Sequence, residues 1–433
     1  MEIQNLAEGN PWWTTREVPE KLKGKLRLNY TLLVKSIDVE EVTIIVGVRR
    51  SGKSTFMYQM IEHLIKKGVP SEQILLVNLE DMRFTKESLE DIYQTYRSKL
   101  NPDKKAYIFF DEIHKKEKWE SWIRRHYDLK TDCKFVVSGS CSYLLKKEYA
   151  ALLTGRNLTF EVYPLSFKEF LGFKGIDIDF AKASKGILLE KDRYLIINAL
   201  SEYLQQGGFP KVFFQEKDFK TKLLEQYFDD ILFKDIIDRH NLNSKKTKDF
   251  AIYLMTNITG LISLRNVRNS LGLSYDAIKD YLSCFVEAFL FFTLDHFSYS
   301  MKEQKSRASK IYCIDNGLRD AVSFKFSQDE GKIAENLVFL ELKRIGSDIY
   351  YWKSKKEIEV DFIVKNLDNS LSAINVTYTD EIPNREINSL KEFKTTFKKT
   401  KKLMVLTKNT EKEEKGIKFI PLWKFLLKEK PLR

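Results

Sequence analysis

The segment GVRRSGKST, residues 47–55, limits the possible folds of this chain more than any other. It follows the pattern G-x-x-x-x-G-K-S, with an apolar run (VTIIV, 42–46) before it and an amphipathic stretch after it. In a loop between a buried strand and a helix N-terminus, backbone N–H groups and the helix dipole hold phosphate groups. The sequence therefore predicts a nucleotide-binding loop made of Gly47, Val48, Arg49, Arg50, Ser51, Gly52, Lys53, Ser54 and Thr55.

This pattern predicts ATP and Mg²⁺ as cofactors. Lys53 is expected to reach the β- and γ-phosphates, and Ser54 to place its hydroxyl on the metal. In the later segment FFDEIH, Asp111 ends an apolar run and Glu112 follows it. A carboxylate at Asp111 can hold Mg²⁺, usually through water, and Glu112 can polarise the attacking water. The alternative is that Asp111 and Glu112 are simply the solvated start of a loop.

The first part of the chain predicts an α/β fold with a parallel sheet. Short apolar segments alternate with helical patterns, which is typical of a sheet covered by helices on both faces. One expected strand lies in the sequence between the lysine loop and Asp111. The five expected strands are 42–46, 73–79, 106–110, 134–140 and 157–165.

This arrangement, with a glutamate beside the acidic Mg²⁺ residue, resembles the additional-strand P-loop ATPases and, within them, the AAA+ group. The resemblance implies a sensor residue at Ser138 or Ser140, between which the sequence does not choose. It also implies that Arg156 is a finger that reaches the ATP of a neighbouring subunit, and hence a homo-oligomer. The alternative for Arg156 is an exposed loop cation.

The segment GGFP resembles the turn that closes over the base in STAND ATPases, which would place Phe209 and Pro210 on adenine; an ordinary loop is the alternative. Taken together, NPWW…VPE, GVRRSGKST, FFDEIH, SGSCSYLL, LTGR…YPLSFKEF and GGFP resemble one broad family. Its members are archaeal and bacterial AAA+ ATPases that carry a C-terminal domain of unknown function. The resemblance covers nearly the whole chain.

The middle of the chain predicts a helical lid followed by a winged helix-turn-helix. A helix before Gly272, a helix opened by Ser274 and a strand-like FLFFTL carry this prediction. The second helix has a net charge of −2, counted from Lys279 against Asp276, Asp280 and Glu287. A helix that approaches phosphates is normally basic. A packing or oligomerisation module is therefore the alternative interpretation to a DNA-binding element.

The C-terminal third resembles PD-(D/E)XK nucleases, with Glu335 on a helix and Asp361 on a strand. Asn375-Val376-Thr377 stands where these enzymes have E-x-K, so we expect cleavage to be lost. Lys353, Lys355 and Lys356 are the candidate replacements for the lysine. A basic run, 385–402, carries a net charge of +5 and is either a solvated helix face or a phosphate contact.

These features predict three parts: an AAA+ core (1–165), a helical lid with a winged helix (166–300) and a PD-(D/E)XK-like domain (301–433). The sequence has no visible secretory signal, apolar run of membrane-spanning length or C-x-x-C pair, which favours a cytoplasmic protein without a membrane partner. The predicted function is Mg²⁺-dependent ATP hydrolysis that controls contact with a partner. The net charge of +12 favours nucleic acid, with DNA ahead of RNA. The alternatives are a STAND-like regulatory switch that binds protein, or an active metal-dependent nuclease.

Overall fold

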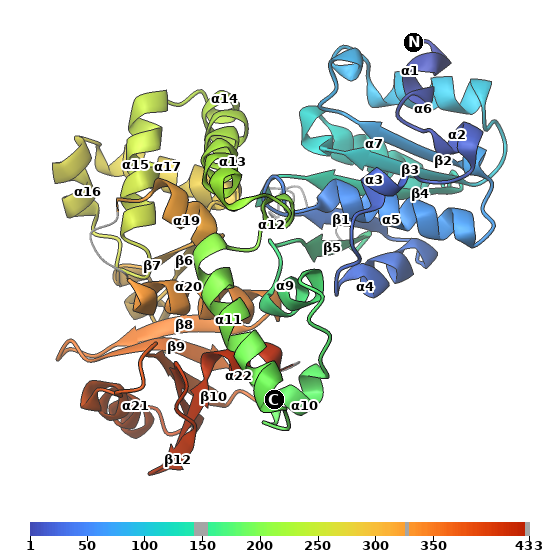
Figure 1. Ribbon diagram of the computed structural model, residues 1–433. Coiled ribbons are helices and arrows are strands. Elements are labelled where there is room, and N and C mark those ends of the chain that lie inside the picture. The colour runs from blue at the N-terminus through green and yellow to red at the C-terminus, as the bar shows by residue number, and fades with distance from the viewer. Residues whose placement is uncertain (143–154, 325–328, 429–433) are drawn as a thin grey trace. The chain divides into compact units, whose positions relative to one another are not determined.

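The structure is a computed structural model that describes residues 1–142, 155–324 and 329–428 (Figure 1). It contains two compact units, Met1–Val162 and Tyr163–Arg433. Each unit has a sheet with helices packed against it. The middle and C-terminal parts of the sequence together form the second unit.

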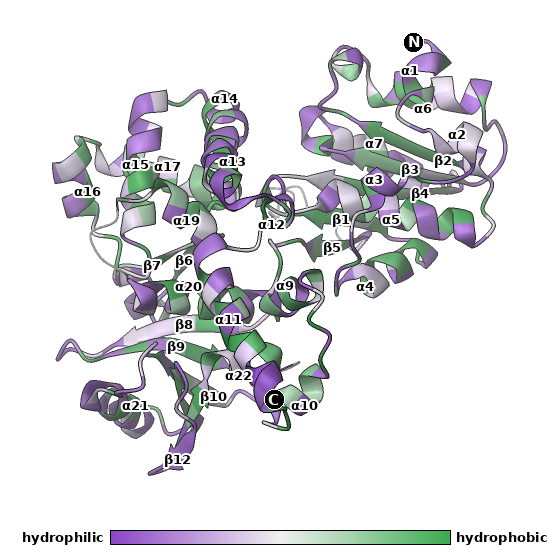
Figure 2. Cartoon of the chain, viewed as in Figure 1, coloured by the Kyte–Doolittle hydropathy of each residue, from purple (hydrophilic) through white to green (hydrophobic). Residues whose placement is uncertain are grey.

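The first unit is built on a five-stranded parallel sheet in the order β2-β3-β4-β1-β5. β4 therefore lies between β1 and β3. Residues in the middle of the sheet are fully buried, and Figure 2 shows these strands as mainly hydrophobic. The parallel α/β prediction is confirmed. The strands are β1 (Val42–Val46), β2 (Ile74–Asn78), β3 (Ala106–Asp111), β4 (Cys133–Gly139) and β5 (Asn157–Glu161).

The fifth strand ends earlier than the sequence predicts. It was expected to continue to residue 165, but β5 ends at Glu161. Its partner β1 ends at Val46, and the last bond between the two segments runs from the Val162 N–H to the Val46 carbonyl at 2.7 Å. Beyond that point no residue of β1 remains to pair with.

Helices cover the sheet of the first unit, and an N-terminal segment packs on β2. The indole N–H groups of Trp12 and Trp13 both donate to the carbonyl of Ile74, at 3.1 and 2.8 Å. The NPWW motif therefore anchors the N-terminus to the sheet. The helices are α1 (Ile3–Ala7), α2 (Trp12–Thr15), α3 (Glu20–Lys23), α4 (Tyr30–Lys35), α5 (Lys53–Lys66), α6 (Leu89–Lys99) and α7 (Trp119–Asp128).

The second unit begins with helices, as the sequence predicts. They are α9 (Phe167–Phe173), α10 (Phe180–Ser184), α11 (Glu190–Gln206), α12 (Pro210–Phe213), α13 (Lys217–Asp230), a π-helical turn (Ile231–Ile237) and α14 (Asp238–His240). α15 (Ser244–Thr256), α16 (Leu264–Leu271) and α17 (Tyr275–Glu287) follow, and then the antiparallel pair β6 (Phe291–Leu294) and β7 (Lys310–Cys313). Gly272 ends α16 with a φ of 63°, and the Ser274 side chain caps α17, both as expected.

A six-stranded sheet in the order β12-β13-β11-β10-β9-β8 forms the rest of the second unit. β8, β9 and β10 are antiparallel neighbours, and β10 pairs in parallel with β11. One face packs an apolar core that includes Trp352, Leu390 and Phe393. Its elements are α18 (Met301–Ser306), α19 (Asn316–Val322), α20 (Glu330–Arg344), β8 (Asp348–Lys353), β9 (Glu359–Lys365), β10 (Leu371–Val376), α21 (Asn384–Thr396), β11 (Thr400–Thr407), β12 (Lys412–Glu414), β13 (Ile417–Pro421) and α22 (Leu422–Leu427).

None of the helices in the described ranges combines the length and the apolar character that crossing a membrane requires.

Candidate nucleotide-binding and catalytic site

The loop of residues 47–52 leaves β1 and enters α5 through backbone conformations that favour glycine. Gly47 has a φ of 153°, and a Cβ built there would lie 2.0 Å from the carbonyl oxygen of Val162. Gly52, with a φ of 101°, directly precedes α5. Any side chain at Gly47 would collide with backbone, which explains in steric terms why the loop begins with glycine.

The Lys53 ammonium is buried inside this loop. Its Nζ donates to the carbonyls of Gly47 and Val48 at 3.0 and 3.2 Å and lies 3.7 Å from Glu112 Oε1. The side chain is only 4% exposed. Nearby, the Ser51 hydroxyl is buried and has no hydrogen-bond partner among the described residues. The loop thus presents a cation and an unsatisfied hydroxyl at the place where the sequence predicts phosphate.

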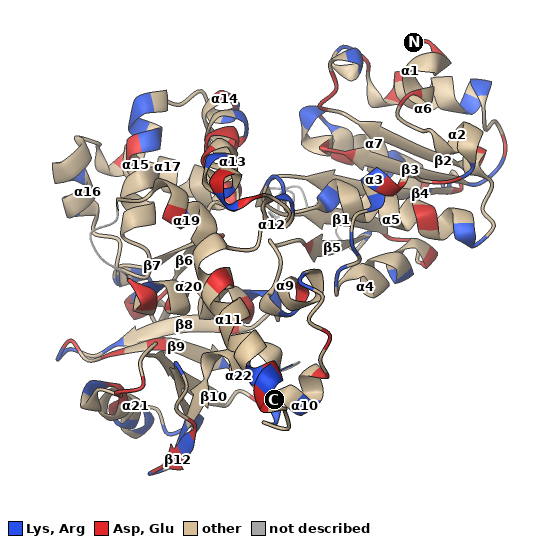
Figure 3. Ribbon diagram, in the orientation of Figure 1, with Lys and Arg blue, Asp and Glu red and all other residues tan. Residues whose placement is uncertain are grey.

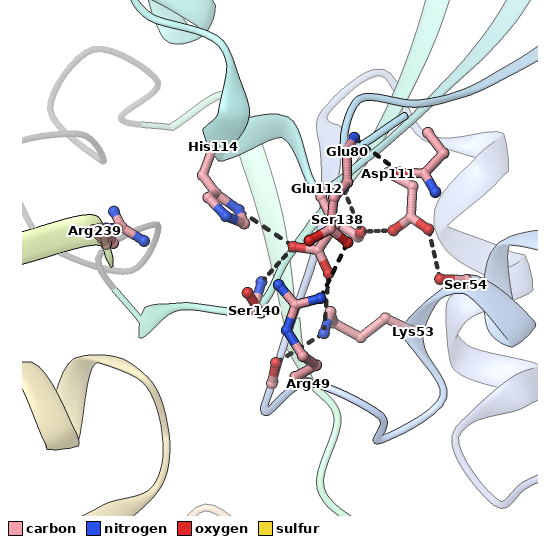
Figure 4. Close-up of polar contacts among 12 residues, drawn as sticks. Arg49, Lys53, Ser54, Glu80, Asp111, Glu112, His114, Ser138, Ser140 and Arg239 are labelled. Carbon is pink, nitrogen blue, oxygen red and sulfur yellow. Dashed lines mark hydrogen bonds and ion pairs between the residues drawn. The ribbon is translucent and has the colours of Figure 1, made fainter. Parts of the chain in front are cut away.

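The side chains of Ser54, on α5, and Asp111, the last residue of β3, are both predicted to hold the metal, and they are hydrogen-bonded to each other. Ser54 Oγ donates to Asp111 Oδ2 at 2.5 Å, and the Ser138 hydroxyl donates to the other carboxylate oxygen (Figure 4). Burial, and then the neighbouring Glu112, raise the pKa of Asp111, while the two hydroxyls oppose that shift. A divalent cation would favour the charged carboxylate of such a group.

Glu112 is held by three contacts in addition to that with Lys53. Its backbone is left-handed, with a φ of 54°, and its N–H donates to Ser138 Oγ at 3.2 Å. Its Oε2 accepts the Ser140 N–H at 3.1 Å and lies 3.3 Å from His114 Nδ1. Burial opposes ionisation, but Lys53, and then His114 and Arg49, outweigh it and lower the pKa of Glu112. The carboxylate is therefore ionised near neutral pH, as a group that polarises water must be.

The two sensor candidates make different contacts, and a further residue that the sequence analysis missed lies beside them. Ser138 contacts Asp111 and the backbone of Glu112 through its hydroxyl, whereas Ser140 contacts the Glu112 carboxylate through its backbone N–H. His114, two residues after Glu112, also faces that carboxylate. A histidine so close to Glu112 in FFDEIH was the available signal.

The remaining loop residues have structural positions. Arg49 is 6% exposed, and its Nη1 lies 3.0 Å from Glu80 Oε2. Val48 is fully buried, Arg50 has a φ of 69°, and Thr55 is partly buried in the first turn of α5. The nine predicted residues thus form one continuous segment: residues 47–52 connect β1 to α5, and Lys53, Ser54 and Thr55 begin α5.

Arg156 lies at the end of the sheet opposite the loop. Its carbonyl accepts the N–H of Val42, the first residue of β1, whereas Gly47 follows the last residue. Five residues of strand span about 16 Å. The Arg156 side chain is 31% exposed, and its Nε donates to Asp128 Oδ1 at 2.9 Å. Arg156 is therefore remote from the loop of its own chain.

Phe209 and Pro210 belong to the second unit. Phe209 is 1% exposed and packs edge-to-face against Tyr227, with ring centroids 5.5 Å apart, and Pro210 begins α12. The Gly208 N–H donates to Asp315 Oδ2 at 2.7 Å, and a Cβ at Gly207 would lie 2.0 Å from Asp315 Oδ1. A Cβ at Gly208 would lie 2.4 Å from the carbonyl oxygen of Leu165, so packing against Asp315 and Leu165 accounts for the two glycines of GGFP.

The residues present in the first unit fit a nucleoside triphosphate and a divalent cation. The narrow loop, the buried Lys53 ammonium and the unpartnered Ser51 hydroxyl suit phosphate oxygens. Ser54 and Asp111 supply oxygen ligands of the kind that Mg²⁺ prefers.

Comparisons with known proteins agree with this geometry. Residues 39–171 match the model of an AAA domain, and residues 197–329 and 330–425 match two domains of unknown function, DUF8612 and DUF4143. The first unit is therefore a nucleotide-binding ATPase domain of the AAA type, with a P-loop. A likeness in fold also exists to the Walker-type ATPase of Pyrococcus abyssi, which is 12% identical and covers 71% of this chain and 97% of that chain, with a TM-score of 0.41.

Two relatives match along almost their entire length. An uncharacterized protein of Methanocaldococcus jannaschii is 32% identical in an alignment 434 positions long, which covers 95% of this chain and 93% of the relative. An uncharacterized protein of Haemophilus influenzae is 31% identical in an alignment 407 positions long, which covers 91% of this chain and 96% of the relative. The chain belongs to the same family as these archaeal and bacterial proteins.

Proposed function

We propose that the protein is a Mg²⁺-dependent ATP hydrolase whose cycle controls contact with a partner. One observation carries the proposal: the Ser54 hydroxyl meets Asp111 at 2.5 Å, directly beside the ionised Glu112 and the buried Lys53. These are the groups needed to hold a metal, neutralise phosphate and polarise water.

Each side chain has a separate task in this proposal. Lys53 turns from the loop carbonyls to the β- and γ-phosphates, and Ser54 and Asp111 hold Mg²⁺, which neutralises charge on the phosphates. Glu112 accepts a proton from the attacking water, and the Ser140 N–H keeps its carboxylate in position. Ser138 positions Asp111 and Glu112 relative to each other, which makes it the better sensor candidate.

The position of Arg156 supports a homo-oligomer in which this residue acts as the finger. The finger cannot reach phosphates bound to its own loop if about 16 Å of strand separates the two. A partially exposed guanidinium at the opposite sheet edge suits the site of a second copy. Its present partner, Asp128, is 43% exposed, and a surface ion pair of this kind contributes little free energy and is easily exchanged.

Nucleic acid, with DNA ahead of RNA, is the partner that the charge favours. The excess of cations over anions is 12, and the blue ribbon segments in Figure 3 mark Lys and Arg at several places in the second unit. α17 does not supply the contact, because Asp276 and Asp280 are exposed and the helix is acidic. The basic run 385–402 is the better candidate for this contact.

The competing function is a STAND-like regulatory switch that binds a protein partner and hydrolyses ATP slowly. The acidic α17 favours such a role for the middle segment. ATP hydrolysis measured without ligand, with DNA and with RNA separates the two functions. Stimulation by nucleic acid that falls steeply as salt increases supports the proposal, whereas an unchanged rate supports the switch. Glu112→Gln is the control, because the rate that remains in this variant measures any contaminating ATPase and can be subtracted.

A further inference from the structure

A lysine that the sequence analysis did not single out lies among three carboxylates of the second unit. Lys310, the first residue of β7, is 3% exposed. Its Nζ lies 3.0 Å from Glu335 Oε1, 2.5 Å from Glu359 Oε1 and 3.5 Å from Asp361 Oδ1. The expected replacements were Lys353, Lys355 and Lys356, but Lys353 pairs with Glu357. The cation beside the acids therefore comes from β7, before α20.

The three acids converge because of their places in the fold. Glu335 lies on α20, and Glu359 and Asp361 are alternate residues of β9, so both point to the same face of the sheet. The Tyr312 hydroxyl donates to the same oxygen of Glu335 at 2.8 Å. Burial lowers the pKa of Lys310, but Glu335, and then Asp361 and Glu359, outweigh burial and raise it well above its usual value. The ammonium is therefore charged.

Asn375, which stands in place of a metal-binding acid, has a structural role. Its Oδ1 accepts the N–H of Asp361 at 3.2 Å. Its Nδ2 donates to Glu386 Oε2 and to Ser389 Oγ, both at 2.8 Å. The side chain is fully buried. Its amide thus joins β9 to α21, and its oxygen is directed at backbone.

A nuclease of the resembled class would place a metal between Glu335 and Asp361, and the residues present do not fit one. A metal would need both carboxylates at about 2.0–2.6 Å, in the space next to the Lys310 ammonium, which would repel it. Within residues 1–142, 155–324 and 329–428, no group of three or more His, Cys, Asp or Glu side chains is arranged to hold a metal.

We infer that Lys310 is a built-in cation that takes the place of the metal, so that the acidic cluster binds strand β7 instead of Mg²⁺ and does not cleave nucleic acid. Lys310, Glu335, Glu359 and Asp361 thus form a buried ion-pair cluster that links β7 to α20 and β9. This inference concerns the second unit alone and is independent of ATP hydrolysis.

The test replaces the built-in cation and offers a metal. Lys310, Glu335 and Glu359 line a cavity of about 400 Å³, through which ions can reach the cluster. Lys310→Ala leaves buried like charges together, so its melting temperature should fall by at least about 5 °C. Millimolar Mn²⁺ should restore most of that loss. The restoration should disappear in the double variant Lys310→Ala/Asp361→Asn, which excludes binding at Asp111.

Lys332→Ala is the matched control. Lys332 lines the same cavity, but its ammonium pairs with Asp329 at 3.5 Å. Its removal should change neither the melting temperature nor the response to Mn²⁺. If Lys310→Ala folds but Mn²⁺ gives no Asp361-dependent restoration, the acids do not form a cation site and the inference is wrong.

The protein that retains Lys310 gives a second test, which does not require Lys310→Ala to fold. The inference predicts that Mn²⁺ shifts its melting temperature equally with and without Asp361→Asn, and that DNA and RNA stay intact in Mg²⁺ or Mn²⁺. Asp361-dependent metal binding, or cleavage that Asp361→Asn abolishes, would overturn the inference. Lys310 would then be the lysine of an active metal site.

Discussion

Replacing Asp315 with asparagine should remove one component of the pH dependence of stability. Asp315 precedes α19 and is 3% exposed; it accepts the N–H groups of Leu318 at 2.9 Å and Gly208 at 2.7 Å. Burial raises its pKa from 3.8 to about 6, although these bonds oppose the shift. The folded protein therefore binds this proton more tightly than the unfolded chain does.

The sign and size of the effect follow from that difference. Between about pH 4 and pH 6 the unfolded chain has released this proton while the folded protein still holds it, so stability falls as the pH rises, and above about pH 6 the loss levels off. Two pKa units correspond to about 3 kcal/mol. Asparagine does not titrate, so the stability of Asp315→Asn relative to the unsubstituted protein should rise by about 3 kcal/mol from pH 4 to pH 7. Its amide N–H groups also face backbone donors, which adds a cost that is independent of pH.

Urea unfolding at several pH values measures this difference. Trp352 and Trp423 are buried in the second unit and report its unfolding by fluorescence. The slope is diagnostic, because a constant offset between the two proteins reflects only the altered hydrogen bonds. Parallel stability curves from pH 4 to pH 7 would refute the assigned pKa and its cause.

Three further predictions concern the ATPase unit. Lys53→Ala should abolish detectable ATP binding, measured by calorimetry, because it removes the buried loop cation; retained affinity would contradict the loop assignment. Ser138→Ala should keep ATP binding but lower kcat by about 10²-fold, as for the loss of one preorganised polar contact, and an unchanged kcat would exclude Ser138 as the positioning residue. Arg156→Ala should bind ATP without turnover, and mixing it with Lys53→Ala protein should recover activity at mixed interfaces; a fully active, monomeric Arg156→Ala protein would exclude the finger.

Local patterns predicted the first unit well. The loop glycines, the apolar strands and the Asp111–Glu112 pair depend on residues close in sequence, whose conformations are set by sterics and burial. The turn at Gly272 and the cap at Ser274 are local in the same sense. The end of β5 was mispredicted because it depends on the length of a distant partner, β1.

Long-range contacts were beyond the sequence. Lys310 reaches Glu335 and Asp361 only because β7 packs beside α20 and β9, and nothing in the residues around Lys310 indicates that meeting. The choice between Ser138 and Ser140 likewise depends on which of the two side chains faces Asp111 on the neighbouring strand β3. His114 was overlooked because one histidine near a carboxylate is a weak signal without geometry.

The central claim is that Glu112 activates water for ATP hydrolysis at the loop of the first unit. Its most direct test is single-turnover hydrolysis of ATP by the unsubstituted protein and by Glu112→Gln, with ATP affinity measured on both. The account predicts that Glu112→Gln binds ATP with Mg²⁺ as tightly as the unsubstituted protein and loses turnover by about 10²-fold or more. Hydrolysis by Glu112→Gln at the unsubstituted rate would contradict it.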